Sequence, residues 1–323
     1  MTLSKLAKLA NVSVSVVSKA FSGREDVSEA MREHVFRVAR EHGCFQQFYH
    51  APYDKPVIAV IIPEAISQYY IHYIEALKQS MERNGYTMLL SISNFDRQLA
   101  DELVRYYTIH SKVDGLLLIA NAGELPQNIT TAVVSFGTDS TRNVGASIAI
   151  DMQAGLQKAL QHLKENGHSR VAYVGEPFTN AQQDGLKVAL ERFGMEIRPE
   201  WFITSHARFE DAGRDGVRHI LAEKERPTAI FGAYGYITKG ILTELSDMGL
   251  RVPQDMSVIS MDSDPFPLDT SLDVTCILSD IEKRCETAMK LLNERIHSGH
   301  PNTPRHIVLP ATFHSGNTVY CQN

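Results

Sequence analysis

The amino-acid sequence predicts an α/β protein with two parts, an N-terminal all-α helix-turn-helix domain and a larger, two-lobed, doubly wound domain behind it. Residues 1–50 show only the helical spacing of apolar residues, whereas from residue 57 onward short apolar runs alternate with amphipathic stretches. The roughly 265 residues of the alternating part exceed one comfortable hydrophobic core, so we expect them to form two lobes.

Three short helices are expected in residues 1–50. Apolar residues at helical spacing from Leu3 to Ala10 predict the first helix. Asn11 tolerates the left-handed conformation of a tight turn, and Ser13 is the expected N-cap of a second helix that runs to about residue 21. Ser28 is the expected N-cap of the third. Two helices joined by so tight a turn are typical of a helix-turn-helix domain.

Strands are expected wherever a short run is almost entirely apolar. These runs are Val57–Ile62, Thr87–Ser93, Gly115–Ala120, Ala132–Phe136, Arg170–Gly175, Thr228–Ala233 and Ser257–Asp262. Amphipathic helices are expected between several of them, at Tyr70–Asn84, Gln98–Ser111, Met152–Asn166, Gln182–Phe193 and Ile237–Met248. This alternation predicts parallel sheets covered by helices on both faces. Ligands of such folds bind at the carboxyl ends of the strands, here between the lobes.

Charge and cysteine content narrow the class of protein. The net charge of the chain is −6, but residues 1–50 carry +2 and the remainder −8, which suits a local contact with phosphates. The four cysteines are widely scattered, which predicts free thiols in a reducing cytoplasm. No apolar run approaches the ~20 residues of a membrane-spanning helix, and no signal peptide is visible, so we expect a cytoplasmic protein.

The motifs of common enzymes are absent from the sequence. It contains no GxSxG, HExxH, GxxxxGK or GxGxxG pattern, and its 13 histidines are dispersed. We therefore expect no catalytic residues, no metal site and no cofactor.

The N-terminal residues carry a family resemblance. The pattern reads Thr2-Leu3-x-x-Leu6-Ala7-x-x-Ala10-Asn11-Val12-Ser13-x-x-x-Val17-Ser18-Lys19. Further matches follow in order at Val27-Ser28, Val113-Asp114-Gly115, Gly167-His168-x-Arg170-Val171, Pro227-Thr228-Ala229-Ile230-Phe231 and Val252-Pro253-x-Asp255. By these residues the whole chain resembles the lactose-repressor/galactose-repressor (LacI/GalR) family of transcription regulators.

The resemblance implies a function and a division of the chain. It implies a homodimeric regulator, by default a repressor, that binds a pseudo-palindromic operator in double-stranded DNA. A small-molecule effector, by default a sugar or sugar derivative, sets the operator affinity. The expected parts are the helix-turn-helix domain 1–50, a linker 51–56 and a periplasmic-binding-protein-like effector-binding and dimerisation domain 57–323. The last has lobe 1 at about 57–150 and 280–308 and lobe 2 at about 151–279 and 309–323, with crossings near Asp151, Ser279 and Leu309.

The second helix is expected to read DNA, because in a helix-turn-helix its N-terminal residues reach base edges in the major groove. The residues expected at the bases are Val14, Ser15, Val16, Ser18 and Lys19. Val16 is equally compatible with a place in the core. Ser13, Ser22 and Ser28 are expected at phosphates, which position the domain without reading sequence.

Two features depart from the family pattern in this region. Lys19 stands where the family usually has arginine, and lysine lacks the fork that grips guanine with two hydrogen bonds. The linker lacks the family's leucine-containing hinge pattern and contains Pro52 and Pro56. Phe48 is a candidate wedge for the minor groove. The alternative is that this ring packs under the sensor or lies in the linker.

The expected effector site follows from the resemblance, position by position. Its candidates are Tyr69, Tyr70, Gln182, Phe209, Tyr234 and Asp262. Tyr70 is better explained as a core residue and Asp151 as a helix cap, and Phe209 has packing between the lobes as its alternative. Gln182 replaces a usual arginine and Tyr234 a usual asparagine, so the site is expected to be more aromatic and less suited to an anion than a typical sugar site.

A second hypothesis remains open from the sequence. The unusual linker is also compatible with a ligand-sensing module that has lost operator binding. The polar residues Ser13, Ser18 and Lys19 on the DNA-facing side of the second helix favour a domain that still reads DNA.

Overall fold

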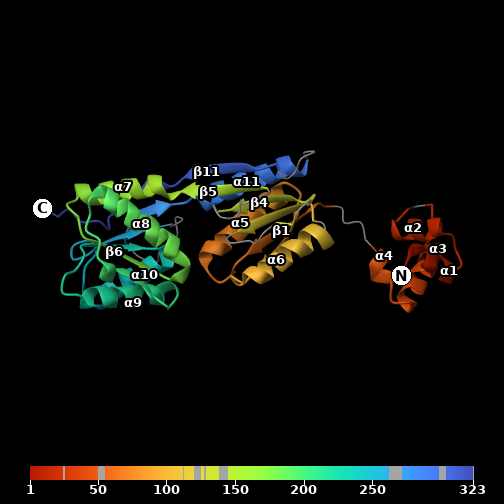
Figure 1. Ribbon diagram of the computed structural model, residues 1–323, viewed down its shortest axis with the longest axis horizontal. Coiled ribbons are helices and arrows are strands. Elements are labelled where there is room, and N and C mark those ends of the chain that lie inside the picture. Colours follow the sequence, from red (N-terminus) through yellow and green to blue (C-terminus); the bar gives the residue numbers. More distant parts are fainter. Residues whose placement is uncertain are drawn as a thin grey trace. The chain divides into compact units, whose positions relative to one another are not determined.

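The computed structural model divides the chain into two compact units, Met1–Pro56 and Val57–Asn323, referred to below as the head and the body (Figure 1). The residues that the structure describes are 1–24, 26–49, 55–111, 113–119, 125–126, 129–137, 145–261, 271–297 and 303–322.

The described residues of the head form the helices α1 (Leu3–Leu9), α2 (Val14–Phe21), α3 (Glu29–Glu41) and the single turn α4 (Phe45–Phe48). The first three begin at side-chain caps, because the hydroxyls of Thr2, Ser13 and Ser28 each accept a hydrogen bond from a backbone N–H of the first turn. Asn11 adopts the left-handed conformation, with φ of 52°, that the tight turn between α1 and α2 requires.

The core of the head is small. Leu6, Val17 and Val35 are fully buried where α1, α2 and α3 meet. Phe21, at the end of α2, contacts the rings of three residues from α3 and α4, with centroids 5.0 to 5.9 Å apart: Phe36, Phe45 and Phe48. A helix-turn-helix domain of this kind was the fold expected for these residues, and it is confirmed.

The first sheet of the body is parallel and has six strands, in the order β11-β5-β4-β3-β1-β2. Its strands are β1 (Val57–Ile62), β2 (Thr87–Ile92), β3 (Gly115–Ile119), β4 (Ala132–Phe136), β5 (Ala146–Asp151) and β11 (Arg305–Pro310). Its helices are α5 (Gln68–Arg83), α6 (Arg97–Arg105), which continues as a π-helical turn at Tyr106–His110, and α11 (Ile281–Ile296). α5 and α11 pack together over one core of this sheet.

The second sheet also has six strands, in the order β12-β10-β9-β8-β6-β7, with only β12 antiparallel to its neighbour. Its strands are β6 (Val171–Gly175), β7 (Phe202–Thr204), β8 (Ala229–Gly232), β9 (Ser257–Ser260), β10 (Cys276–Leu278) and β12 (Thr312–His314). Its helices are α7 (Met152–Glu165), α8 (Asn180–Phe193), α9 (Phe209–Ala222) and α10 (Gly235–Asp247), with 3-10 turns at Pro177–Thr179 and Pro199–Trp201. Trp201, the single tryptophan of the chain, is fully buried in this lobe.

The chain passes between the two sheets three times, from β5 to α7, from β10 to α11 and from β11 to β12 (Figure 1). Asp151 ends β5 and caps α7, since its carboxylate accepts a hydrogen bond from the backbone N–H of Gln153 at 3.0 Å. The two doubly wound lobes expected from the alternating pattern are confirmed, because strands such as β3, β4 and β6 are buried along their whole length. All four cysteines are free thiols.

Candidate functional site

The second helix of the head presents one exposed edge. Val14, Ser15 and Ser18 are exposed, whereas Val17 and Ala20 are buried in the head's core. Val16 is half-buried, between the two environments. The residues expected at base edges therefore lie on the outer side of a short helix whose inner side is fixed by the core, the arrangement needed to enter a major groove.

The serines expected at phosphates already take part in local hydrogen bonds. The hydroxyls of Ser13 and Ser28 accept from the backbone N–H groups of Val16 and Met31, so each O–H remains available to donate to a phosphate oxygen. The Ser22 hydroxyl instead donates to the backbone oxygen of Lys19 at 3.3 Å, and it must give up that bond before it can donate to DNA.

Lys19 is held by an acidic neighbour. Its Nζ lies 2.5 Å from Oδ2 of Asp26, in an ion pair whose side chains are 44% and 53% exposed. The hydrogen bond from Lys19 is the largest cause of a lowered pKa for the Asp26 carboxyl. Because both groups remain in water, the pair is weak and a base or phosphate can compete for the lysine.

The ring of Phe48 belongs to the head itself. Phe48 ends α4 and packs 5.7 Å from the ring of Phe21, as part of the aromatic group beneath α3. Gln47 of the same turn donates to the backbone oxygen of Met1 at 2.8 Å. The structure thus packs Phe48 on the core of the head rather than leaving it in the linker, and a role as a minor-groove wedge requires α4 to leave that core.

In the body, an arginine joins the two lobes. Arg208, just before α9 of the second lobe, donates from Nη1 and Nη2 to both carboxylate oxygens of Glu64 in the first lobe, at 2.8 and 3.2 Å. Its Nε and Nη2 also lie 3.3 and 3.4 Å from the oxygens of Glu176 in the second lobe. These two hydrogen-bonded carboxylates hold the pKa of Arg208 above its ordinary value, with Glu64 the larger cause.

The two carboxylates occupy equivalent places in the two lobes. Glu64 follows β1 and Glu176 follows β6, the first strand of each sheet, and in each sheet that strand lies one place in from the edge. Both residues are buried, at 7% and 2% exposure. The carboxyl ends of these strands are where doubly wound folds bind ligands, so the charges stand where a ligand is expected.

Three phenylalanine rings surround the arginine. The Arg208 guanidinium lies 5.7, 5.1 and 4.4 Å from the ring centroids of Phe95, Phe178 and Phe209. Phe95 of the first lobe and Phe178 of the second stack on each other, 4.3 Å apart and 19° from parallel. These six residues, Glu64, Phe95, Glu176, Phe178, Arg208 and Phe209, form what we call the inter-lobe cluster.

Two members of the cluster have an unusual backbone. Phe95 and Phe209 both have φ of 58°, in the left-handed region that bulky residues rarely enter. Such strain persists only where the surrounding structure holds it, and it gathers at binding sites.

Of the residues expected at the effector site, one belongs to this cluster, two lie against its members, and two lie elsewhere in the first and second lobe. Phe209 is a member, and Tyr70 contacts Phe95 with ring centroids 6.3 Å apart. Burial raises the pKa of Tyr234 well above its ordinary value, and the charge of Glu176 contributes. Tyr69 lies in the first lobe against Tyr70 and Tyr73, and Gln182 lies on α8, in the first turn after Phe178. Asp262 falls outside the described residues.

Sequence reasoning missed the charged centre of the cluster. None of the cluster residues except Phe209 was singled out, and Arg208 is separated by 144 residues from Glu64. The sequence did contain one sign of this site. An acidic residue follows the first apolar run of each lobe, in Ile62-Pro63-Glu64 and in Gly175-Glu176-Pro177.

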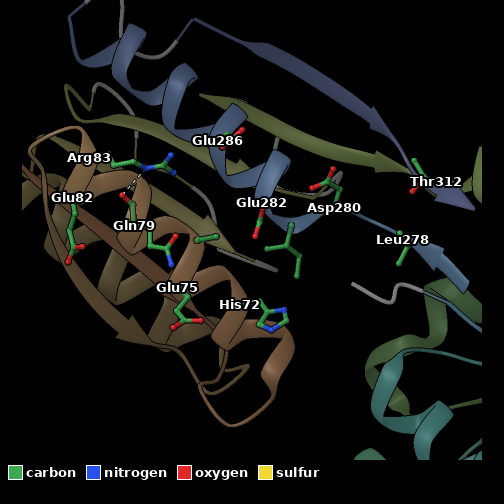
Figure 2. Close-up of a pocket in the computed structure, with 12 residues that line it drawn as sticks. His72, Glu75, Gln79, Glu82, Arg83, Leu278, Asp280, Glu282, Glu286 and Thr312 are labelled. Atoms are coloured by element: carbon green, nitrogen blue, oxygen red, sulfur yellow. Dashed lines mark hydrogen bonds between the residues drawn. The ribbon is translucent and has the colours of Figure 1, made fainter. Parts of the chain in front are cut away.

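A separate groove lies between α5 and α11, with a volume of about 860 Å³ (Figure 2). Its acidic lining residues are Glu75, Glu82, Asp280, Glu282 and Glu286. His72 and Arg83 also line it, and Arg83 donates to the backbone oxygen of Gln79. None of the expected effector residues that the structure describes lines this groove. The described part of the chain also holds no group of three histidine, cysteine or acidic side chains placed to bind a metal ion.

None of the helices in the described part of the chain has the length and apolar character that crossing a lipid bilayer requires.

Comparison with known proteins identifies both parts of the chain. Residues 2–45 match the model of bacterial regulatory proteins of the lacI family, and residues 160–319 match a periplasmic binding protein-like domain. The ribose operon repressor of Haemophilus influenzae is 24% identical over 99% of this chain and 98% of its own length. A transcriptional repressor of Yersinia pestis, PurR, is 29% identical over 92% of this chain and 91% of its own length.

Among solved structures, the lac repressor dimer bound to operator and an anti-inducer is similar over 99% of both chains, with a TM-score of 0.70 and 19% identity. This likeness confirms the fold, a helical head followed by two α/β lobes. Matches to both domain models occur in the expected order, and relatives align along nearly the whole chain. The head carries a domain of the lacI family of bacterial regulatory proteins, a periplasmic binding protein-like domain follows it, and the expected family resemblance is confirmed.

Proposed function

We propose that this DNA-binding transcription regulator reads its operator through the outer edge of α2 and is controlled by a small molecule bound between the two lobes of the body. The observation that carries the first half is the exposed edge Val14, Ser15 and Ser18, with Lys19 beside it, on a helix whose opposite side is buried. The inter-lobe cluster supports the second half, because it gathers charged, aromatic and strained residues at the carboxyl ends of equivalent strands.

The assembly proposed is a homodimer on a pseudo-palindromic site. Two heads related by a two-fold axis contact two half-sites of opposite orientation, so the symmetry of the protein is repeated in the DNA. The lac repressor, to which the fold is similar, is a dimer on its operator. We place the protein in the cytoplasm, where bacterial DNA lies, and propose no catalytic role for it.

The names of the relatives make a sugar the default effector, as in the ribose operon repressor. An effector of this kind acts through the angle between the lobes. A coupling free energy of ~1–3 kcal/mol is typical between two such sites and changes DNA affinity about 5- to 150-fold.

Selection of bound sequences from a random DNA pool tests the proposal. The full-length protein should enrich a two-fold symmetric site, with affinity that falls as salt rises because cations are released from the DNA. Recovery of no specific sequence would contradict it and favour a sensing module that no longer reads an operator.

Two substitutions that each remove one positive charge test whether the exposed edge of α2 reads DNA bases. Lys19→Met should weaken binding and relax the base preference at one position of each half-site. Lys5→Met, which removes an exposed lysine from α1, should weaken binding without altering the preferred sequence. Equal changes in preference for both variants would show that α2 does not read bases.

A further inference from the structure

The inter-lobe cluster contains more buried negative charge than its arginine can balance. Glu64 and Glu176 are buried at 7% and 2% exposure, and in the cluster the single cation facing both is Arg208. Buried carboxylates are strongly unfavourable without a cationic partner. Any rearrangement of this site must therefore keep a positive charge between the two acids.

Arg208 is the member of the cluster that is able to leave. Its side chain is 32% exposed, whereas those of Glu64 and Glu176 are 9% and 3% exposed. Its guanidinium is carried on a long, flexible stem from the N-cap position of α9, so the charged group can move while the backbone stays in place. The two glutamates and the three phenylalanine rings form the fixed part of the site. The Arg208 guanidinium occupies the space between them and remains attached to the chain.

The fixed part has the composition of a cation-binding site. Aromatic faces within 6 Å attract a guanidinium or ammonium group, and three rings already lie at that distance from Arg208. Among the described residues, the side-chain oxygen of Gln182 is buried without a hydrogen-bond partner. An amide oxygen can only accept, so a ligand that supplies a further N–H donor suits it.

Other classes of ligand suit the site less well. A sugar would replace the ion pairs of Arg208 with hydrogen bonds from neutral hydroxyls, and the negative charges of both buried carboxylates would then have no cationic partner. An anion would have to lie beside two buried carboxylates. A cation exchanges for Arg208 with no change of charge.

We propose that the inter-lobe cluster binds a small organic cation, a guanidinium or primary ammonium compound, whose place the side chain of Arg208 takes in this structure. The ligand's cationic group lies between Glu64 and Glu176 and against Phe95, Phe178 and Phe209, and Arg208 turns out to solvent. This inference rests on the proposed control of the regulator from between its lobes, and it replaces the default sugar by a cation.

The test uses the full-length protein and agmatine, which carries both a guanidinium and an ammonium group. Calorimetry should detect binding to the unmodified chain. Arg208→Ala should bind agmatine at least about tenfold more tightly, since it removes the internal competitor. Arg208→Lys, a weaker competitor, should lie between the two. Ribose and citrate should bind none of the three proteins through this site.

Methylguanidinium provides a second readout that does not require a tight ligand. It should raise the unfolding temperature of Arg208→Ala, because it restores the cation between the acids. The control is Arg214→Ala, which removes an arginine of matching exposure, 30%, from Glu244 and Asp247 while Arg218 still pairs with Glu244. Methylguanidinium should leave the unfolding temperature of this variant unchanged.

Two results would overturn the proposal. One is equal affinity of agmatine for the unmodified chain and Arg208→Ala, or no binding to either. The other is ribose binding that Glu176→Gln abolishes. Operator binding, measured on the same preparations, separates this inference from the proposed function. Specific DNA binding without cation binding removes only the inference, and cation binding without specific DNA binding removes only the DNA-reading role.

Discussion

The head and the body each hold a cation in an ion pair at the place where a ligand is expected, but the two pairs differ in their surroundings. Lys19 and Asp26 in the head are 44% and 53% exposed, whereas Glu176 in the body is 3% exposed beside Arg208. Water screens the first pair, so DNA can take the lysine from it. The acids of the second are out of water, so only another cation can replace the arginine. Exposure, more than the chemistry of the pair, decides which partner each site accepts.

The largest expected difference between the head and the body is in how each responds to the loss of stability that a buried cavity causes. Leu6 in the head and Leu160 in the body are both fully buried, and Leu→Ala at such a position costs about 3 kcal/mol. Because the head has a small core and correspondingly little stability, Leu6→Ala should unfold it and abolish DNA binding. Leu160→Ala should only lower the unfolding temperature of the body, followed by the fluorescence of Trp201. A head of Leu6→Ala that still binds operator would contradict this comparison.

Removal of Arg208, the cation of the body's ion pair, should have the next largest effect on stability. Arg208→Ala should destabilise the body by about 2 kcal/mol, less than the ~3–5 kcal/mol of a fully buried pair because the arginine is partly exposed. Urea unfolding monitored by tryptophan fluorescence measures this change. Asp26→Asn, the equivalent change in the head, should leave the head's unfolding midpoint unaltered. Similar losses in both regions would show that exposure does not distinguish the two pairs.

The same Asp26→Asn change should instead appear in DNA affinity. It frees Lys19 and removes a negative charge beside the proposed reading edge of α2, so operator affinity at low salt should rise several-fold. Fluorescence anisotropy of a labelled operator measures the effect. Glu33→Gln, which frees Arg40 from a similarly exposed pair on α3, is the control and should change affinity less. Lower affinity of Asp26→Asn would mean that Asp26 positions the lysine for DNA.

The smallest expected effect is a pH dependence confined to the body. Burial lowers the pKa of His168 below its ordinary value of 6.5, and the neutral ring bonds Thr228 and the backbone oxygen of Tyr320. A lowered histidine pKa means that stability is complete above pH 6.5 and declines as pH falls below it, since the unfolded chain takes up the proton more readily. The body's unfolding temperature should therefore drop between pH 7.5 and 5.5, and His168→Gln should reduce that slope. An unaltered slope would exclude His168 as the cause.

The sequence predicted the fold class and most of the buried strands, for a physical reason. Strands such as β3 and β4 are covered on both faces and so appear as unbroken apolar runs. Five strands were not among the predicted runs, the six-residue β5 and β11 and the three-residue β7, β10 and β12. The short ones are selected by their neighbours in the sheet rather than by their own residues. β11 alternates between half-buried and exposed residues, so it does not form an unbroken apolar run. The cap at Asp151 and the turn at Asn11 were predicted because both depend on local chemistry.

The charged centre of the inter-lobe cluster could not be predicted in the same way. The bond between Arg208 and Glu64 depends on how two lobes meet, and no local pattern around Ala207-Arg208-Phe209 indicates it. The packing of Phe48 was missed for a related reason. Its partner Phe21 lies across the head's core, and only the three-dimensional packing shows that the two rings meet.

The central claim is that the inter-lobe site controls the DNA-reading head, and one titration tests it most directly. Operator affinity should be measured by anisotropy for Arg208→Ala and for Arg214→Ala, with and without saturating agmatine. The account predicts a change of about fivefold or more, the lower limit of typical coupling between such sites, for both variants, because both keep the two acids. Arg214→Ala, which retains Arg208 as a competitor, should need more agmatine to reach it than Arg208→Ala. Unchanged operator affinity in Arg208→Ala, under conditions where calorimetry shows agmatine bound, would contradict it.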